Sequence, residues 1–188
     1  MENAVVEDAP TLVQDARLWQ ANGWTDPISL VKAVRPCGSH SDDAALAARI
    51  FPALDLREAK ESCNQSQRID AKAFTVNRLT DAKVLLTREC GVVAYNDQSF
   101  ALIADDKPPY AALRPAGTGC LEAKDGSLTS VQKGRGIGDC LWVEEAHFDV
   151  QGFVCTREAG DTMCQGFAGG AWNLPRYVSR VEYVPPRH

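Results

Sequence analysis

The pattern of hydrophobic and polar positions along the chain changes near residue 70. Before that point, residues 11–22 place apolar side chains at helical spacing, which predicts a short helix. The apolar run 28–34 predicts a strand or a buried extended segment. Two more short helices are expected, over residues 44–51 and from Asp55 onward, because residues that favour helix N-termini precede or begin each of them.

After residue 70 the apolar runs are short, rich in Val, Thr, Phe and Tyr, and separated by turn residues. This texture is typical of β-strands joined by tight turns. Asp125 and Gly126, which lie between two apolar runs, predict a β-hairpin. The other predicted strands cover residues 73–79, 84–90, 99–104, 140–145, 147–156 and 176–184.

These patterns together predict an α+β fold. A mainly helical segment, residues 1–68, is expected to pack on a mainly antiparallel β-sheet, which the β-rich part, residues 69–188, would form. A chain of 188 residues is long enough for one well-buried core, so a single domain over residues 1–188 is expected.

Composition narrows the classes of partner. The chain is 45% hydrophobic and 24% charged, which is ordinary for a globular protein, and its net charge is −5. A broad basic surface is therefore not expected, and neither nucleic acid nor an anionic membrane is a favoured partner. No apolar stretch reaches the roughly 18 residues of a membrane span, so no such span is expected.

The chain contains seven cysteines, which is the unusual feature of its composition. None are spaced as zinc ligands and only three histidines accompany them, so neither a metal site nor a cofactor is expected. Well-spread cysteines indicate disulfides and an oxidising compartment, although several could instead be buried thiols. Cys37 and Cys63 flank the helical segment, and a bond between them would staple it to itself.

Catalytic motifs do not stand out. The chain has no Gly-x-Ser-x-Gly, His-Glu-x-x-His or Cys-x-x-Cys motif. His147 could act in a hydrolase as an acid–base group together with Asp139 or Glu145. The alternative is a solvated strand face, because His147 and Glu145 would point to the same side of one strand.

Residues 133–140 read KGRGIGDC, with three glycines around Arg135 and Asp139. A phosphate cradle would need a helix after the loop, but the following residues read as a strand, which favours an irregular turn. Arg135 has two interpretations. It bridges Asp139 and locks the loop, or it is an exposed anchor for an acidic or phosphorylated group of a partner.

Aromatic and amide side chains supply the remaining candidates. Tyr95, Asn96 and Trp172 carry groups that sugar-binding and protein-binding surfaces use, although buried core aromatics are the default. The predicted binding residues are Arg135, Asp139, Tyr95, Asn96 and Trp172.

Two segments carry a resemblance to a known family. Residues 88–96 contain Cys90 shortly before Ala-Tyr-Asn, and the KGRGIGDC string is followed by further aromatic residues and by Cys164-Gln165-Gly166. Over about residues 50–180 the chain resembles the bacterial family called "domain of unknown function eleven-seventy-six". The resemblance implies an exported, periplasmic protein, and it brings no catalytic residues.

The resemblance also implies two disulfides. Cys140 and Cys164 both belong to the family pattern and would pair, while Cys120 and Cys155 are both extra to it and would pair with each other. Cys90 would then remain a free, buried thiol. The start of the chain shows no basic region followed by an apolar run, so the given sequence is expected to begin at the mature end of an exported protein.

The function expected from these features is that of a non-enzymatic periplasmic binding protein. It would be an inhibitor or immunity protein that binds an envelope-targeting toxin or enzyme, such as a basic toxin or a cell-wall enzyme, because an acidic surface complements a basic one. The alternatives are an envelope hydrolase that uses His147, and a structural envelope module without a discrete ligand.

Overall fold

The computed structural model describes residues 30–38, 40–54, 70–110, 114–119, 121–160, 164–168 and 174–185. The helices predicted over residues 11–22 and from Asp55 onward, as well as Trp172, lie outside these ranges.

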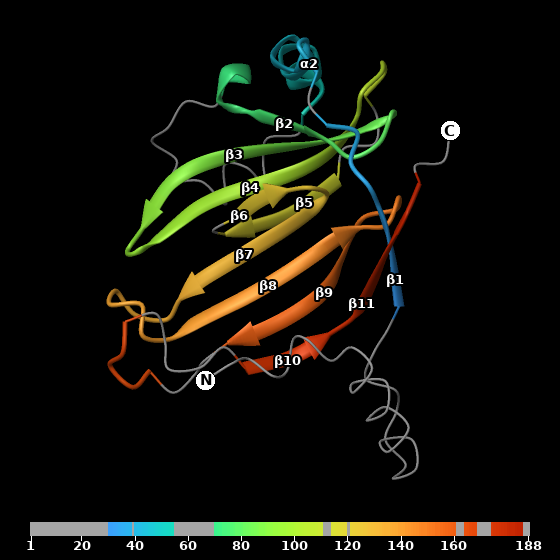
Figure 1. The fold of residues 1–188 in the computed structure, drawn as a ribbon. Coiled ribbons are helices and arrows are strands. Elements are labelled where there is room, and N and C mark those ends of the chain that lie inside the picture. The colour runs from blue at the N-terminus through green and yellow to red at the C-terminus, as the bar shows by residue number, and fades with distance from the viewer. Residues whose placement is uncertain are drawn as a thin grey trace.

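The described residues are built mainly from strands (Figure 1). The helical elements are α2 (Asp43–Ile50) and the 3-10 turns η1 (Phe51–Ala53) and η2 (Ala71–Ala73). The strands are β1 (Leu30–Val34), β2 (Thr75–Arg78), β3 (Lys83–Val93), β4 (Asn96–Asp105), β5 (Arg114–Gly119), β6 (Leu121–Lys124), β7 (Ser127–Lys133), β8 (Leu141–Phe148), β9 (Phe153–Gly160), β10 (Leu174–Val178) and β11 (Arg180–Val184).

These strands form two antiparallel sheets and one parallel pair. A four-stranded sheet has the order β2-β3-β4-β5, and a five-stranded sheet has the order β10-β9-β8-β7-β6. The pair joins β1 to β11 in parallel, with Leu30 opposite Arg180 and Val34 opposite Val184. Figure 1 shows this pair running across the ends of the five-stranded sheet.

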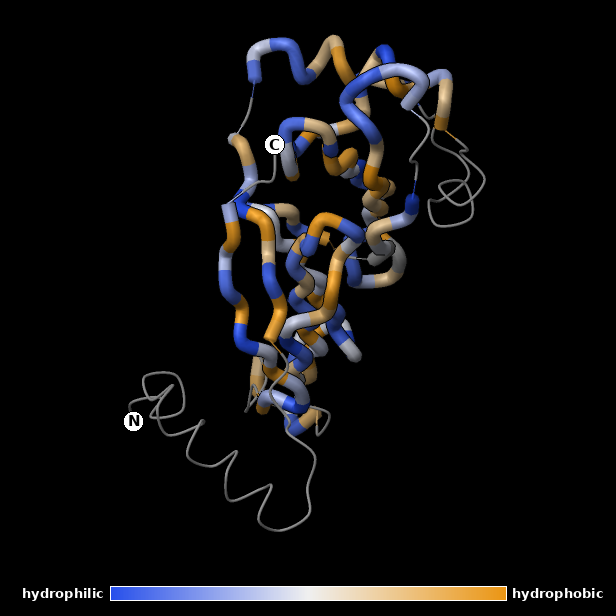
Figure 2. Tube along the Cα trace, turned by 90° about the vertical axis from the view of Figure 1, so that its right-hand side faces the viewer, coloured by the Kyte–Doolittle hydropathy of each residue, from blue (hydrophilic) through white to orange (hydrophobic). Residues whose placement is uncertain are grey.

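Side-chain alternation on β3 and β4 creates two cores, because successive residues of a strand face opposite sides. Leu86 and Phe100 pack with Leu46 and Ile50 of α2 on one side of the four-stranded sheet. On the other side, neighbouring residues of these strands pack against the five-stranded sheet. That second core contains Val34, Leu79, Leu85, Ala101, Ile103, Leu128 and Phe148. Figure 2 shows the alternation of hydrophobic and hydrophilic residues along several strands.

The hairpin predicted from Asp125 and Gly126 is present between β6 and β7. Both residues have positive φ, 49° and 79°, as a two-residue hairpin turn requires. Gly126 also lies against the chain after β1, where a β-carbon would approach the Val34 carbonyl oxygen at 3.2 Å and Pro36 at 3.1 Å. The turn therefore packs against the N-terminal strand segment.

The predicted fold class, a helical segment packed on one antiparallel sheet, is wrong. Within the described residues α2 is the one α-helix and is eight residues long, and the same N-terminal region contributes β1. Strand β1 joins the last strand, β11, so residues 30–34 extend the β-structure instead of belonging to a helix. Hydrophobic periodicity is local and does not indicate such pairing between chain ends. Strand β5 was also missed, because Pro115, Gly117 and Gly119 disfavour strands.

The structure also corrects the expected cysteine pairing. Cys37 and Cys155 are free thiols, so the predicted bonds Cys37–Cys63 and Cys120–Cys155 are absent. Cys90 is disulfide-bonded, and the expectation that it is free is wrong. A disulfide needs its two α-carbons within about 7 Å, and this proximity depends on the fold rather than on the positions of the cysteines in the sequence. No helix within the described ranges is long and apolar enough to cross a membrane.

Candidate functional site

Residues 133–140, here called the glycine loop, connect β7 to β8. The loop closes on itself through two backbone hydrogen bonds, from Gly134 N to Cys140 O at 2.9 Å and from Gly138 N to Arg135 O at 2.9 Å. Gly138 has a φ of +67°, and a β-carbon on Gly134 would lie only 2.8 Å from Cys140 Sγ. Two of the three glycines are thus required by the turn itself, and the loop leads into a strand.

Arg135 and Asp139 form an ion pair inside the loop. Arg135 Nε donates to Asp139 Oδ1 at 3.1 Å, and Arg135 Nη2 donates to Asp139 Oδ2. The same Nη2 donates to the Cys164 carbonyl oxygen at 2.6 Å, and the Gly166 amide donates to Asp139 Oδ2 at 2.8 Å. The Asp139 side chain is fully buried, whereas 52% of the Arg135 side chain is exposed. The Arg135 hydrogen bonds are the main cause that lowers the pKa of Asp139, while burial opposes them.

A disulfide between Cys140 and Cys164 covalently joins the glycine loop to residues 164–168. The expectation of this pair is confirmed. Among the residues that the structure describes, Asp139, Cys140 and Cys164 form one group whose potential ligand atoms lie within 4.8 Å of one another. Both sulfurs are bonded to each other and the carboxylate is bonded to Arg135, so this group offers no thiolate to a metal.

The turn between β3 and β4 docks onto the start of the glycine loop. Asn96 makes a reciprocal pair with the main chain of Lys133, accepting from its N–H at 2.8 Å and donating to its carbonyl at 3.0 Å. The Tyr95 hydroxyl donates to Gly134 O at 2.8 Å. Ala94 has a φ of +55°, which allows the tight turn. Tyr95 and Asn96 therefore act first as positioning groups for the loop.

The structure brings four of the five predicted binding residues into one network. They are Tyr95, Asn96, Arg135 and Asp139, and their bonds span 37 and 39 residues between the β3–β4 turn and the glycine loop. Trp172, the fifth, lies outside the described residues.

Two exposed apolar residues of this site were missed from the sequence. Ile137, at the tip of the glycine loop, is 61% exposed, and Phe167, next to the Gly166 that binds Asp139, is 64% exposed. A signal for Ile137 was available, because an apolar residue between glycines in a turn has no core to enter. Together with exposed Tyr95 and Arg135, these residues form what is here called the binding face.

His147 lies apart from Asp139, so the predicted pairing of these two residues as acid and base is not formed. The Thr156 hydroxyl donates to Glu145 O at 3.0 Å, so His147 Nδ1, 2.8 Å from this hydroxyl, is the donor of their hydrogen bond. His147 Nε2 is 3.7 Å from Glu145 Oε1, and the His147 ring packs in a T-shaped arrangement against the Tyr183 ring, with the ring centroids 5.9 Å apart. Burial lowers the pKa of His147, and Glu145 opposes this shift.

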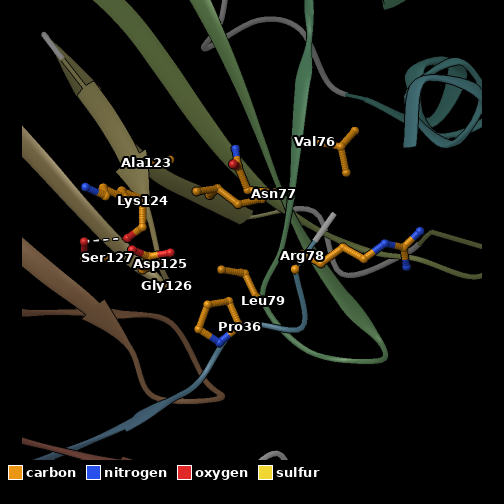
Figure 3. A pocket seen from close by; sticks show the side chains of 12 residues that line it. Pro36, Val76, Asn77, Arg78, Leu79, Ala123, Lys124, Asp125, Gly126 and Ser127 are labelled. Carbon is orange, nitrogen blue, oxygen red and sulfur yellow. Dashed lines mark hydrogen bonds between the residues drawn. The ribbon is translucent and has the colours of Figure 1, made fainter. Parts of the chain in front are cut away.

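A small cavity lies at the seam between the two sheets. Its volume is about 170 Å³, and Figure 3 shows the residues of the β6–β7 turn on one side and Asn77 and Leu79 on the other, with Pro36 next to Leu79. Ser127 Oγ donates to the Lys124 carbonyl oxygen at 2.7 Å, which closes the turn. The volume is below the range of about 300–1,000 Å³ that is typical of small-molecule sites, so this cavity supports no ligand.

A second cavity, of about 410 Å³, lies where α2 meets the four-stranded sheet. The buried Arg78 donates from Nε to Asp43 at 2.9 Å and has Nη1 3.7 Å from Asp106. Cys37 donates its thiol to Asp81 at 3.3 Å, and burial, followed by this contact, raises the pKa of the thiol. The charged residues here connect α2 to the sheet, and the raised pKa of Cys37 favours the thiol over the reactive thiolate.

The chain was compared with known families and proteins. A family described as "Protein of unknown function (DUF1176)" matches residues 24–179, further toward the N-terminus than the resemblance indicated. The "Uncharacterized protein YpfG" of Escherichia coli (strain K12) is 32% identical over 118 residues, which cover 54% of this chain and 34% of that protein. The chain thus spans about a third of that relative. No solved structure shows significant similarity. This chain therefore belongs to the DUF1176 family.

Proposed function

We propose that this chain is a non-enzymatic protein-binding domain of the bacterial periplasm and that its binding face contacts another protein. The observation that carries this proposal is the exposure of Ile137 on the glycine loop and of Phe167 on residues 164–168, the segment that the Cys140–Cys164 disulfide joins to that loop. Exposed apolar side chains that are grouped on a surface are characteristic of interaction sites.

The rigidity of the binding face supports this function. The disulfide Cys140–Cys164, the pair of Arg135 with Asp139 and the reciprocal bonds of Asn96 all constrain the loop before any partner arrives. A surface that is already ordered loses little conformational entropy on binding. Burying Ile137 and Phe167 in an interface would contribute about 1.5–3 kcal/mol for each side chain.

The polar groups of the site are engaged within the protein rather than arranged around a substrate. Asp139 accepts from Arg135 and Gly166, and Tyr95 donates to Gly134. In this proposal these bonds shape a surface and perform no chemistry. An inhibitor or immunity role against an envelope-targeting toxin or enzyme is the finer form of the proposal, motivated by the acidic net charge and the cysteine content.

Affinity purification from a periplasmic extract of the source bacterium tests the proposal. We expect the tagged wild-type protein to retain a stoichiometric partner and the double variant Ile137→Asp, Phe167→Asp to lose it. Val150→Asp is the matched control, since Val150 is also an exposed apolar residue but lies in the turn at the other end of β8. Capture of the same proteins by all three forms would contradict the proposal, provided that circular dichroism shows all three to be folded.

A further inference from the structure

Resting on the proposed function, we propose that the binding face recognises an Asp or Glu side chain of the partner, flanked by apolar residues, and that Arg135 binds this carboxylate. The partner segment would lie across the guanidinium of Arg135 while its apolar side chains contact Ile137 and Phe167.

The guanidinium of Arg135 is oriented by hydrogen bonds, and the described residues do not occupy all of its donors. Its Nε and Nη2 donate to Asp139 and to the Cys164 carbonyl oxygen, and no hydrogen bond from Nη1 is formed to any described residue. Half of the side chain is exposed. An arginine that is already fixed in orientation can donate to a further carboxylate at a low entropic cost.

The Asp139 carboxylate is not itself presented at the surface to a partner. Its carboxylate is fully buried and accepts from two arginine nitrogens and the Gly166 amide. Lys133 adds a second exposed cation at the start of the same loop, with Nζ 3.4 Å from the Tyr95 carbonyl oxygen. The binding face therefore presents positive groups on a chain whose net charge is −5, and a carboxylate complements them.

The apolar contacts favour an internal acidic residue of the partner over a chain terminus. Ile137 belongs to the glycine loop and Phe167 to residues 164–168, and Arg135 bonds both segments. A segment that covers both apolar side chains needs residues on either side of its carboxylate, which a C-terminal carboxylate lacks. Anionic lipid and a second copy of the chain are the other occupants that the experiment separates.

The decisive change is made in the probe, so that the fold of the protein is untouched. ¹⁵N-labelled protein is titrated with the peptide acetyl-Leu-Asp-Phe-amide, with its isostere acetyl-Leu-Asn-Phe-amide and with acetyl-Leu-Phe carrying a free C-terminus. We expect the Asp peptide to shift the Arg135 Nε–H signal and the amides of Gly136, Ile137 and Phe167, with an affinity at least about tenfold above that of the Asn isostere. Lys133→Gln should weaken this binding, whereas Lys124→Gln, an exposed lysine at the β6–β7 turn, should not.

The failures of the two proposals are distinguishable. Equal affinity of the Asp and Asn peptides, tighter binding of the free C-terminus, or no shift at millimolar Asp peptide would overturn the carboxylate inference. The carboxylate inference would also be overturned if raising the protein concentration alone, or adding vesicles of phosphatidylglycerol, produced the same shifts. In any of these cases the Ile137→Asp, Phe167→Asp variant can still lose its partner in the affinity purification. The proposed protein binding by the binding face would then stand, and only the recognition of a carboxylate would be wrong.

Discussion

Arg135 bonds Asp139 through two nitrogens, yet the two side chains have opposite exposure: the carboxylate is completely buried and the guanidinium is half exposed. The ion pair is therefore asymmetric. The buried carboxylate of Asp139 accepts a hydrogen bond from Gly166 and so holds the glycine loop to residues 164–168. The exposed part of the Arg135 guanidinium remains available at the surface.

Replacing Arg135 with Gln should destabilise the protein because the buried carboxylate of Asp139 loses its cation. We expect the melting temperature of Arg135→Gln to fall by about 4–8 °C. Adding Asp139→Asn should restore part of that loss, since the unpaired charge is then gone. Thermal denaturation followed by circular dichroism measures both variants. A double variant whose loss equals the sum of the two single losses would show that the residues are not coupled.

The same pair predicts a dependence of stability on acid pH. Because Arg135 lowers the pKa of Asp139 in the folded state, this carboxylate binds its proton at lower pH when folded than when unfolded. The stabilisation is therefore complete above about pH 4, the ordinary range of an unfolded Asp, and is lost as the pH falls through the lowered pKa. Urea denaturation should show that the stability difference between wild type and Asp139→Asn shrinks as the pH falls below about 4. A constant difference would contradict the linkage.

Two glycines of the loop should respond differently to alanine. A β-carbon at Gly134 would lie 2.8 Å from Cys140 Sγ, inside the disulfide, whereas a β-carbon at Gly136 would meet Tyr95 at an ordinary 3.5 Å. We expect Gly134→Ala to cost about 1–3 kcal/mol of unfolding free energy and Gly136→Ala to be nearly neutral. Gly152→Ala, with no atom within 4 Å of the added carbon, is the control. Equal effects at Gly134 and Gly136 would be inconsistent with the close approach to the disulfide.

The buried His147 predicts a second loss of stability as the pH falls, which begins near neutral pH instead of at acid pH. Burial lowers its folded-state pKa, so the unfolded chain binds the proton first as the pH falls below about 6.5. Stability from the neutral imidazole is therefore present above this pH and is lost progressively as the pH falls below it. The melting temperature of wild type should decline between about pH 7.5 and pH 5.5 more than that of His147→Gln. The exposed His40, changed to Gln, serves as control, and parallel curves for all three proteins would refute the assignment.

The disulfide Cys140–Cys164 should stabilise the folded protein and keep residues 164–168 on the glycine loop. It closes a loop with a sequence separation of 24 residues, for which the chain-entropy model predicts about 3–4 kcal/mol. The variant Cys140→Ser, Cys164→Ser should lose roughly this amount in urea denaturation. Cys155→Ser, which removes an exposed free thiol, should change little. An unaffected double variant would mean that hydrogen bonds alone retain the segment.

Local features of the sequence were sufficient to predict several elements. Alternation and turn residues predicted most strands after residue 70, and Asp125-Gly126 predicted the β6–β7 hairpin. One of the two interpretations of Arg135, a bridge to Asp139 four residues away, is the bond that the structure shows. Each of these features depends on interactions between neighbours in the chain, which a linear pattern contains.

Apart from the Cys140–Cys164 disulfide, which the family resemblance implied, the contacts between distant segments were known only from the tertiary structure. The parallel pairing of β1 with β11 places residues 30–34, predicted to belong to a helical segment, in the β-structure. The bonded state of Cys90 reversed an assignment made by pairing the other six cysteines with one another. The contact of Asn96 with Lys133, 37 residues away, likewise required the β3–β4 turn to reach the other sheet. Such contacts depend on how sheets pack and twist in space, and the exposure of Phe167 beside the buried Asp139 site could be known only from that packing.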